Sequence, residues 1–268
     1  MRCKVVFILL SRSGKSTKTA QQNQASEADC IVLRGINKYF DEKHVLKDID
    51  LQIPYGKIFG LLGPSGCGKT TLVKIMAGIL KPESGEVTVL NRVVPQLELL
   101  DQIGYMAQSD ALYMNLSGRE NLQFFGSLYR MKKDVLRARI DEIMQAVSLF
   151  EDLDKEVQAY SGGMKRRLSL AVSILHNPPL LLLDEPTVGI DPLLRQDIWR
   201  EFNKLSEQGV TMIVTTHVMD EADKCDQIAM MRDGKIIAQG TAQELQQRVG
   251  VNTLEEAFIL YGGAQDEG

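Results

Sequence analysis

The sequence of 268 residues has no apolar stretch that approaches the ~20 residues needed by a helix that crosses a membrane. One short apolar run, at residues 5–10, follows Arg2 and Lys4. It is short for the core of a signal peptide, and no small-residue cleavage site directly follows it. The sequence therefore predicts that any work at a membrane is done through separate membrane-spanning subunits.

Cysteines are few and follow no recognisable pattern. The four, at positions 3, 30, 67 and 225, form no C-x-x-C pair and no spacing typical of a metal site. The small number and the spacing of the cysteines predict a protein of the reducing cytosol rather than a fold held by disulfides. Blocks of basic residues are also missing, and the net charge is -4 with a pI near 5.5. These absences argue against a dedicated nucleic-acid binder.

Length and composition fit one large domain with an inserted subdomain rather than two independent domains. Hydrophobic residues make up 44% of the chain, which is enough for a sizeable core. Residues 1–29 are rich in Ser, Gln, Lys and Thr, and we expect them to form a mobile N-terminal extension. The main domain is expected over residues 30–245, and a short C-terminal helix with a tail over residues 246–268.

An early glycine-rich segment has the pattern G-x-x-x-x-G-K-[ST]. It follows the apolar residues 58–62 and precedes apolar residues at helical spacing, which is the strand, loop and helix context that this pattern requires. Its glycines let backbone N–H groups surround phosphate, while Lys69 reaches the outer phosphates and Thr70 faces magnesium. The pattern therefore predicts nucleotide binding. The candidate residues are Gly63, Pro64, Ser65, Gly66, Cys67, Gly68, Lys69 and Thr70.

Cys67 lies inside this segment, just before the predicted helix. The positive end of that helix is expected to lower the pKa of the Cys67 thiol and to favour the thiolate. The alternative is that Cys67 is only a small residue tolerated at a variable position, because burial would oppose reactivity.

Two consecutive carboxylates, Asp184 and Glu185, follow the apolar run of residues 180–183. Such a run predicts a fully buried parallel strand, and open α/β sheets place their ligands at the carboxyl ends of strands. Asp184 would then hold magnesium through water. Glu185 would orient and polarise the water that attacks the outer phosphate. By itself an Asp-Glu pair is more often a solvated turn, so the order and spacing of the motifs carry this interpretation.

A third motif, Ser161-Gly162-Gly163, precedes the acidic pair. By itself it is typical of a linker. With the other two motifs in this order, the chain from about residue 31 to residue 262 resembles the nucleotide-binding subunit of an ATP-binding cassette (ABC) transporter. The resemblance implies that Ser161 and Gly163 contact the outer phosphate of ATP held by the partner chain, on its loop that ends at Thr71. It also implies a helix that begins near Met164.

The resemblance extends to four further positions. Gln108 resembles the glutamine that touches magnesium and water, and His217 resembles the histidine that contacts the outer phosphate. Asp191 resembles the acidic residue that crosses the dimer interface, and Tyr39 resembles the aromatic residue that stacks on adenine. An ordinary polar cap is the alternative for His217. An ordinary strand aromatic is the alternative for Tyr39, and Phe40 could fill either role.

Within the third motif, Tyr160 stands first and Met164 last, where many cassettes have Leu and Gln. This variant, with residues 189–191 and residues 110–113, resembles the daunorubicin-resistance exporter branch of the family. The phosphate contacts implied for the Ser-Gly-Gly residues do not depend on either position.

The order of expected elements predicts an α/β fold, a P-loop NTPase parallel-sheet core with an antiparallel β edge and an inserted helical subdomain. Residues 31–53 are expected to form strands around a hairpin turn at residues 41–43, and residues 86–89 to extend that edge. A capping box at residues 117–120 predicts helices within the inserted subdomain, at about residues 109–160. Apolar residues repeat there at helical spacing, namely Val135, Ile140, Ile143, Met144 and Val147. The C-terminal helix is expected to stop at Gly262-Gly263.

These features predict an ATP-hydrolysing subunit of an ABC transporter, specifically an exporter. By the resemblance, it dimerises around two Mg-ATP, with a second copy or a paired second cassette, and drives an integral membrane permease from the cytoplasmic face of the membrane. A soluble cassette acting in DNA repair, translation or chromosome structure is one alternative, and a regulatory cassette that hardly turns over ATP is another. Glu185 and His217 count against the regulatory cassette. A simple P-loop kinase or GTPase would not explain Ser161-Gly162-Gly163 or Gln108.

Overall fold

The computed structural model of the protein describes residues 29–109 and 111–263. The extension expected over residues 1–29 therefore lies outside the described residues, except for Asp29. Asp110, part of the segment that resembles the exporter branch, and residues 264–268 of the expected tail also lie outside them.

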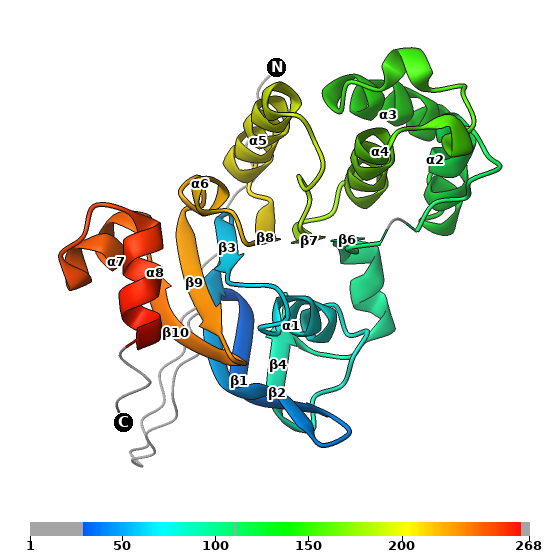
Figure 1. The fold of residues 1–268 in the computed structure, drawn as a ribbon. Coiled ribbons are helices and arrows are strands. Elements are labelled where there is room, and N and C mark those ends of the chain that lie inside the picture. The colour runs from blue at the N-terminus through cyan, green and yellow to red at the C-terminus, as the bar shows by residue number, and fades with distance from the viewer. Residues whose placement is uncertain (1–28, 110, 264–268) are drawn as a thin grey trace, which may run out of the picture.

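A central sheet of six strands organises the described part of the chain (Figure 1). Its order is β10-β9-β3-β8-β7-β6, and all neighbours are parallel except the edge strand β10. The strands are β3 (Ile58–Leu62), β6 (Ile103–Met106), β7 (Leu180–Asp184), β8 (Thr211–Thr216), β9 (Gln227–Arg232) and β10 (Lys235–Gly240). Every residue of β3, β7 and β8 is buried, because helices cover both faces of the sheet. The buried strand predicted before Glu185 is confirmed.

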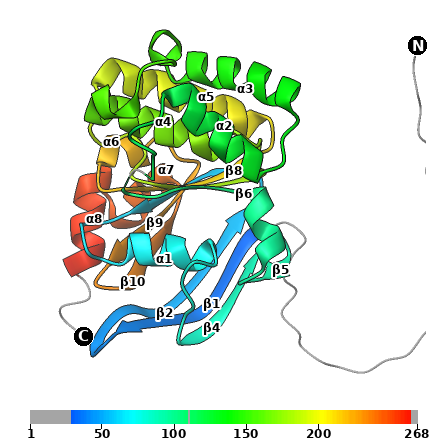
Figure 2. The same cartoon turned by 90° about the vertical axis from the view of Figure 1, so that its right-hand side faces the viewer.

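A second, antiparallel sheet forms the expected β edge. Its order is β2-β1-β4-β5, built from β1 (Asp29–Phe40), β2 (Lys43–Pro54), β4 (Ser84–Val89) and β5 (Arg92–Val93). Figure 2 shows helix α1 (Lys69–Met76) between the two sheets, and its buried side chains belong to a core shared with both. The predicted α/β class with a parallel core and an antiparallel edge is therefore confirmed.

Helices α2 (Gly118–Leu128), α3 (Lys133–Ala146) and α4 (Gly162–Ile174) lie on the face of the central sheet opposite α1 (Figure 2). Three short 3-10 helices accompany them in the described chain, namely η1 (Leu97–Gln102), η2 (Phe150–Asp152) and η3 (Val157–Ala159). The capping box predicted at the start of α2 is present. The Ser117 hydroxyl accepts a hydrogen bond from the Glu120 N–H at 3.2 Å, and the Glu120 carboxylate accepts one from the Ser117 N–H at 2.7 Å.

One residue of the apolar stripe predicted in α3 faces solvent. Val135 is 57% exposed, whereas Leu136 is 7% exposed and lies in the core with Ile140 and Ile143. Leu136, Ile140 and Ile143 recur at intervals of four and three, so they share one helix face. Val135 lies on the adjoining face, and its assignment to the stripe was wrong.

The C-terminal part of the described chain contributes α5 (Pro192–Glu207), α6 (Met219–Ala222), α7 (Ala242–Val249) and α8 (Leu254–Gly263). Helix α8 buries Leu254 and Ala257 and includes Gly262 and Gly263, the last residues that the structure describes. A Cβ at Gly262 would lie 2.1 Å from Arg232 Nη1, so the helix end packs closely on β9. Within residues 29–109 and 111–263, none of the helices combines the length and the apolar character needed to span a bilayer.

His176, in the turn between α4 and β7, stacks on Tyr129 at the end of α2 with ring centroids 3.7 Å apart. Burial lowers the pKa of His176 from 6.5 to about 4. Between about pH 6.5 and pH 4 the unfolded chain therefore protonates this ring while the folded chain does not. The contribution of His176 to the free energy of unfolding consequently falls as the pH drops from 6.5 towards 4.

We expect His176→Phe to remove about 1 kcal/mol of the stability loss between pH 7 and pH 5, a figure reduced because the residue as a whole is only partly buried. Phenylalanine keeps the ring stack but binds no proton. Urea unfolding of the wild type and the variant at pH 7 and pH 5 measures the difference. The same pH dependence in both proteins would contradict the lowered pKa of His176.

Candidate active site

The glycine-rich loop at residues 63–68 joins the end of β3 to the start of α1. Gly66 and Gly68 have φ values of 80° and 112°, which glycine adopts without strain. A Cβ at Gly63 would lie 2.3 Å from the carbonyl oxygen of Met231, so the loop can pass β9 only without a side chain there. The loop leads into the N-terminus of α1, where unpaired N–H groups and the helix dipole favour a bound anion.

Lys69, the first residue of α1, is 6% exposed. Its Nζ donates hydrogen bonds to the carbonyl oxygens of Gly63 at 2.6 Å and Pro64 at 3.0 Å, so the buried ammonium is held against the loop. The loop and the start of α1 line a cavity of about 240 Å³, here called the phosphate cavity. Gln108 and Glu185 line it too, although they come from distant parts of the sequence. The lining residues are Val45, Ser65, Gly66, Gly68, Lys69, Thr70, Thr71, Gln108 and Glu185.

Glu185 is the centre of a three-way contact at the carboxyl ends of the parallel strands. Its carboxylate accepts a hydrogen bond from Gln108 Nε2 at 3.4 Å and lies 3.1 Å from His217 Nδ1. These three side chains follow β6, β7 and β8, which are parallel neighbours. The carboxyl ends of the three strands therefore bring them to one edge of the sheet. The Glu185 side chain is 13% exposed. The structure therefore brings together the three residues predicted to carry out catalysis.

Asp184 is buried behind this contact, with 1% of its surface exposed. Its Oδ1 accepts a hydrogen bond from the Thr215 hydroxyl at 2.6 Å, and the same hydroxyl accepts one from the Glu185 N–H at 2.9 Å. Asp184 Oδ2 is buried and has no hydrogen-bond partner among the described residues. A buried carboxylate oxygen without a partner is costly, so this position fits a cation.

The described residues contain no cluster of three or more His, Cys, Asp or Glu side chains that could hold a metal ion. A cation at Asp184 would therefore be completed by hydroxyl, amide and phosphate oxygens. Thr70 and Gln108, the other two predicted metal ligands, both line the phosphate cavity. This set of oxygen donors suits Mg²⁺, which is bound through one or two carboxylates together with substrate phosphates.

The Ser161-Gly162-Gly163 motif opens helix α4 but contributes nothing to the phosphate cavity of its own chain among the described residues. Ser161 is the N-cap of α4, and its hydroxyl accepts a hydrogen bond from the Met164 N–H at 3.2 Å. The helix begins at Gly162, close to the predicted start near Met164, and this cap holds its first turn. Ser161 and Gly162 are exposed, so the motif is presented at the surface.

Asp191 caps the next helix, α5. Its Oδ1 accepts hydrogen bonds from the N–H groups of Leu193 at 3.2 Å and Leu194 at 3.1 Å, and the side chain is exposed. A Cβ at Gly163 would lie 3.1 Å from the carbonyl oxygen of Gly189. The loop before Asp191 and the Ser-Gly-Gly motif therefore touch and form one continuous surface.

Tyr39 lies near the end of β1, is 42% exposed, and stacks on His44 with ring centroids 4.0 Å apart. Phe40 is also exposed, and Lys38 Nζ lies 5.3 Å from the centroid of its ring. Val45, which follows His44 on β2, lines the phosphate cavity. The β1–β2 hairpin that carries Tyr39 therefore borders this cavity.

Cys67 differs from the expectation of a reactive thiol. Its side chain is 5% exposed and packs into the core shared by the two sheets. Burial raises the pKa of the Cys67 thiol, and this effect outweighs the opposing charge of Lys69. The prediction of a lowered pKa was wrong, because it considered the helix end but not the desolvation of the side chain. The structure supports the alternative of a small residue tolerated in the loop.

Two residues that the sequence analysis did not single out support the site. Thr215 binds both members of the acidic pair, as described above. Glu221, on α6, is 2% exposed and accepts hydrogen bonds from the hydroxyls of Thr216, at 2.7 Å, and Thr187. Thr187 lies in the loop after β7 and Thr216 directly precedes His217, so one buried carboxylate links two loops of the site. A local signal was the pair of hydroxyl residues, Thr215 and Thr216, at the carboxyl end of β8.

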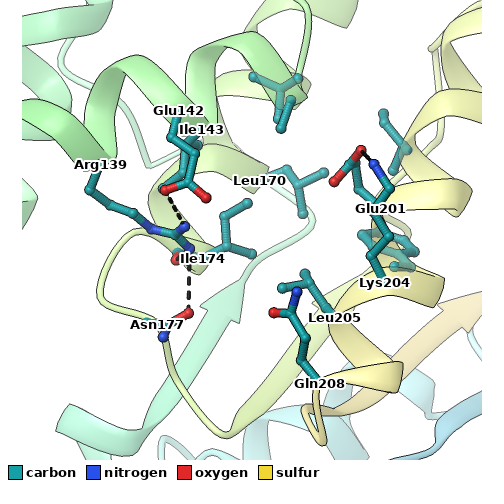
Figure 3. Close-up of a pocket in the computed structure, with 14 residues that line it drawn as sticks. Arg139, Glu142, Ile143, Leu170, Ile174, Asn177, Glu201, Lys204, Leu205 and Gln208 are labelled. Atoms are coloured by element: carbon teal, nitrogen blue, oxygen red, sulfur yellow. Dashed lines mark hydrogen bonds and ion pairs between the residues drawn. The ribbon is translucent and has the colours of Figure 1, made fainter. Parts of the chain in front are cut away.

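A second cavity, of about 230 Å³, lies between α3, α4 and α5 (Figure 3). Its charged side chains pair with one another, Arg139 with Glu142 at 2.9 Å and Lys204 with Glu201 at 2.6 Å. None of the predicted site residues lines it. The cavity marks the seam between the helical insertion and the core, while the predicted catalytic groups converge elsewhere, on the phosphate cavity.

Comparison with known proteins adds independent findings. A family model described as "ABC transporter" matches residues 46–188. The chain is similar to the "Probable multidrug ABC transporter ATP-binding protein YbhF" of Escherichia coli (strain K12), with 38% identity over 236 residues. That match covers 85% of this chain but 41% of the relative, so the chain spans about two fifths of that protein.

The "Daunorubicin resistance ATP-binding protein DrrA3" of Streptomyces coeruleorubidus is 38% identical over 228 residues, covering 84% of this chain and 72% of that protein. Among solved structures, the chain is similar to a dimeric structure of a post-hydrolysis state of an ATP-binding cassette bound to ADP and Pi. The TM-score is 0.73 at 28% sequence identity, and the match covers 79% of this chain and 98% of that chain.

Proposed function

Because this chain belongs to the ABC transporter family, we propose that it is the ATP-hydrolysing subunit of an exporter and drives a separate membrane permease. The family match and the similar proteins confirm three predictions, namely the family, the P-loop NTPase fold and an ATPase as the class of activity. The observation that carries the proposal is the phosphate cavity, where Glu185 contacts both Gln108 and His217. We propose the same division of the chain as the sequence predicts, with the helical subdomain at about residues 109–160.

In this proposal the outer phosphates of ATP lie at the N-terminus of α1, inside the loop of residues 63–68. Lys69 supplies positive charge at this point, because its ammonium is already held at the loop by two carbonyl oxygens. Thr70 and Thr71 line the same cavity. Tyr39 would stack on adenine from the neighbouring hairpin, where its ring is exposed to solvent.

Mg²⁺ would be held by Asp184, through water, together with Thr70 and Gln108. The support is the buried Asp184 Oδ2, which has no partner among the described residues and therefore gains from a nearby cation. Bound together with ATP, such an ion would supply positive charge that offsets the negative charge developing on the phosphate during transfer. The part of the protein is to fix the Asp184 carboxylate, which Thr215 does from the next strand.

Glu185 would accept a hydrogen bond from the attacking water and orient it towards the outer phosphate. Its carboxylate is already fixed by the amide of Gln108 on one side and by the ring of His217 on the other. His217 and Gln108 would then also reach the phosphate and its magnesium. Because such hydrolysis depends mainly on positioning and charge stabilisation, a rigid arrangement of these three side chains is the main contribution of the site.

We propose that the site is completed by a second cassette. Ser161 and Gly163 would offer a hydroxyl and a backbone N–H to the outer phosphate of ATP bound by the partner chain. The exposure of the motif and its absence from the cavity of its own chain support this role. Asp191, on the surface continuous with the motif, would contribute to the same interface.

The permease is proposed to dock on the helical subdomain, at the cytoplasmic face of the membrane. Tyr113 is 48% and Leu128 59% exposed, and together with Phe124 they give this subdomain an accessible apolar surface. The Tyr113 and Phe124 rings lie 4.7 Å apart in an edge-to-face contact. Exposed aromatic clusters of this kind are common in protein interfaces.

The direct test is ATP hydrolysis by the purified chain, measured as phosphate release with MgATP and with ATP plus EDTA. We expect hydrolysis to saturate with MgATP and to fall to background when EDTA removes the metal, because the charge on the phosphates is then no longer neutralised. The same chain should bind a fluorescent ATP analogue. Binding without any hydrolysis would contradict the proposed activity and would favour a regulatory cassette.

A further inference from the structure

A buried arginine connects the Ser-Gly-Gly helix to the candidate active site. Arg166 lies on α4 and is 6% exposed. Its Nη1 donates hydrogen bonds to the carbonyl oxygens of Ala107 at 2.8 Å and Gln108 at 2.9 Å. Its Nε donates to the carbonyl oxygen of Glu185 at 3.2 Å, and its Nη2 donates to the same oxygen at 2.8 Å and to the carbonyl oxygen of Asp184.

These acceptors belong to the two segments that carry the proposed catalytic groups. One is the end of β7 with Asp184 and Glu185, and the other is the segment after β6 with Gln108. A guanidinium is planar and presents donors in a fixed fork, so it can hold several carbonyl oxygens at once in one geometry. Arg166 therefore fixes the backbone of both segments relative to each other.

Glu185 needs such support because its backbone is in an unusual conformation. Its φ is 51°, in the left-handed region that a residue with a side chain rarely adopts. A conformation of this kind is strained and persists only when its surroundings hold it. The Glu185 carbonyl accepts two bonds from Arg166 and its N–H donates one to Thr215, so both sides of the residue are held.

Helix α4, which carries Arg166, also carries the exposed Ser-Gly-Gly motif at its start. Ser161 is the N-cap of α4, and Arg166 lies in the first turns of that helix. A rigid helix therefore joins the residues proposed to meet ATP of the partner chain to the backbone of Glu185 in their own chain.

We propose that Arg166 is a positioning residue that holds Glu185 and Gln108 in the geometry needed for hydrolysis. It also couples that geometry to the position of helix α4, which carries the Ser-Gly-Gly motif. The inference rests on the proposed ATPase function. It adds a residue that acts by placing the backbone of Glu185 and Gln108, whose side chains are proposed to act on water and phosphate. Its loss should lower kcat more than the affinity for ATP, because it donates to the backbone of the segments that carry Glu185 and Gln108.

Arg167 offers a matched control on the same helix. It is 9% exposed, and its Nη1 donates to the carbonyl oxygens of Val147 at 2.9 Å and Ser148 at 2.6 Å. These acceptors lie at the end of α3, within the helical subdomain. Arg166 and Arg167 are therefore the same type of residue, similarly buried and both bonded to carbonyl oxygens, but only Arg166 holds the catalytic segments.

The experiment compares Arg166→Met, Arg166→Lys and Arg167→Met with the wild type in steady-state ATP hydrolysis, nucleotide binding and thermal unfolding. We expect Arg166→Met to lose about 30-fold or more in kcat with KM for ATP within about twofold. Arg166→Lys should recover part of kcat, because one ammonium replaces only some donors of the fork. Arg167→Met should lower the Tm by a comparable amount yet keep kcat close to that of the wild type.

Equal losses of kcat in Arg166→Met and Arg167→Met would overturn the inference and leave Arg166 a structural residue. A rise in KM with unchanged kcat would also overturn it, since the residue would then act on ATP binding. Failure of both Arg166 variants to fold would count against it in the same way. A wild-type protein that binds ATP without hydrolysing it would instead refute the proposed function on which the inference rests.

Discussion

Glu185→Gln is expected to bind ATP nearly as well as the wild type, to lose hydrolysis by about a hundredfold or more, and to accumulate as an ATP-bound dimer. The amide has nearly the shape of the carboxylate and keeps the contact with Gln108, but it accepts no proton from the attacking water and carries no charge to polarise it. ATP then stays at the interface after the two chains have closed. Phosphate release measures the first effect, and size-exclusion chromatography with and without ATP measures the second.

Glu98→Gln is the control for this experiment, because Glu98 is an exposed carboxylate outside the phosphate cavity. It should hydrolyse ATP at the wild-type rate and show no trapped dimer. Hydrolysis by Glu185→Gln at the wild-type rate would refute the assignment of Glu185 as the residue that activates water.

Ser161→Arg is expected to leave ATP binding by the single chain intact but to reduce hydrolysis by about a hundredfold, because a large cation would occupy the space where the phosphate of the partner chain must approach. Lys69→Ala should fail for a different reason, since it removes the charge that binds phosphate in its own chain. A 1:1 mixture of the two variants is the informative sample. Half of its dimers are mixed, and each mixed dimer holds one site with both Lys69 and Ser161 intact.

In a two-fold symmetric dimer both chains contribute to each of the two sites, so about a quarter of all sites in the mixture are intact. The mixture is therefore expected to recover up to about a quarter of the wild-type rate. Activity no higher than the average of the two variants measured separately would contradict a site built from two chains. Ser161→Ala is the matched control, because it removes the N-cap bond to Met164 at a cost of about 1 kcal/mol without adding bulk. It should hydrolyse ATP better than Ser161→Arg.

Local patterns in the sequence were sufficient for the elements that carry the site. The apolar run before Asp184 predicts a buried strand because residues covered on both faces need not alternate, and β7 is fully buried. The glycines, Lys69 and Thr70 predict the phosphate loop because a loop that passes close to another strand and turns through positive φ requires glycine at set positions. The capping box at Ser117 is likewise local, since its two hydrogen bonds join residues of one turn.

The tertiary structure alone decided which side chains support these elements and what environment surrounds them. Thr215, Glu221 and Arg166 act through partners far away in the sequence, so no local pattern shows which groups they hold. Burial decided two further points, because the pKa of the Cys67 thiol and the outward position of Val135 depend on which neighbours remove water from each side chain. The sequence by itself thus determined the motifs and the strand ends that carry the chemistry. Only the packing of distant segments determined how those groups are held, because hydrogen bonds and desolvation act across space and not along the chain.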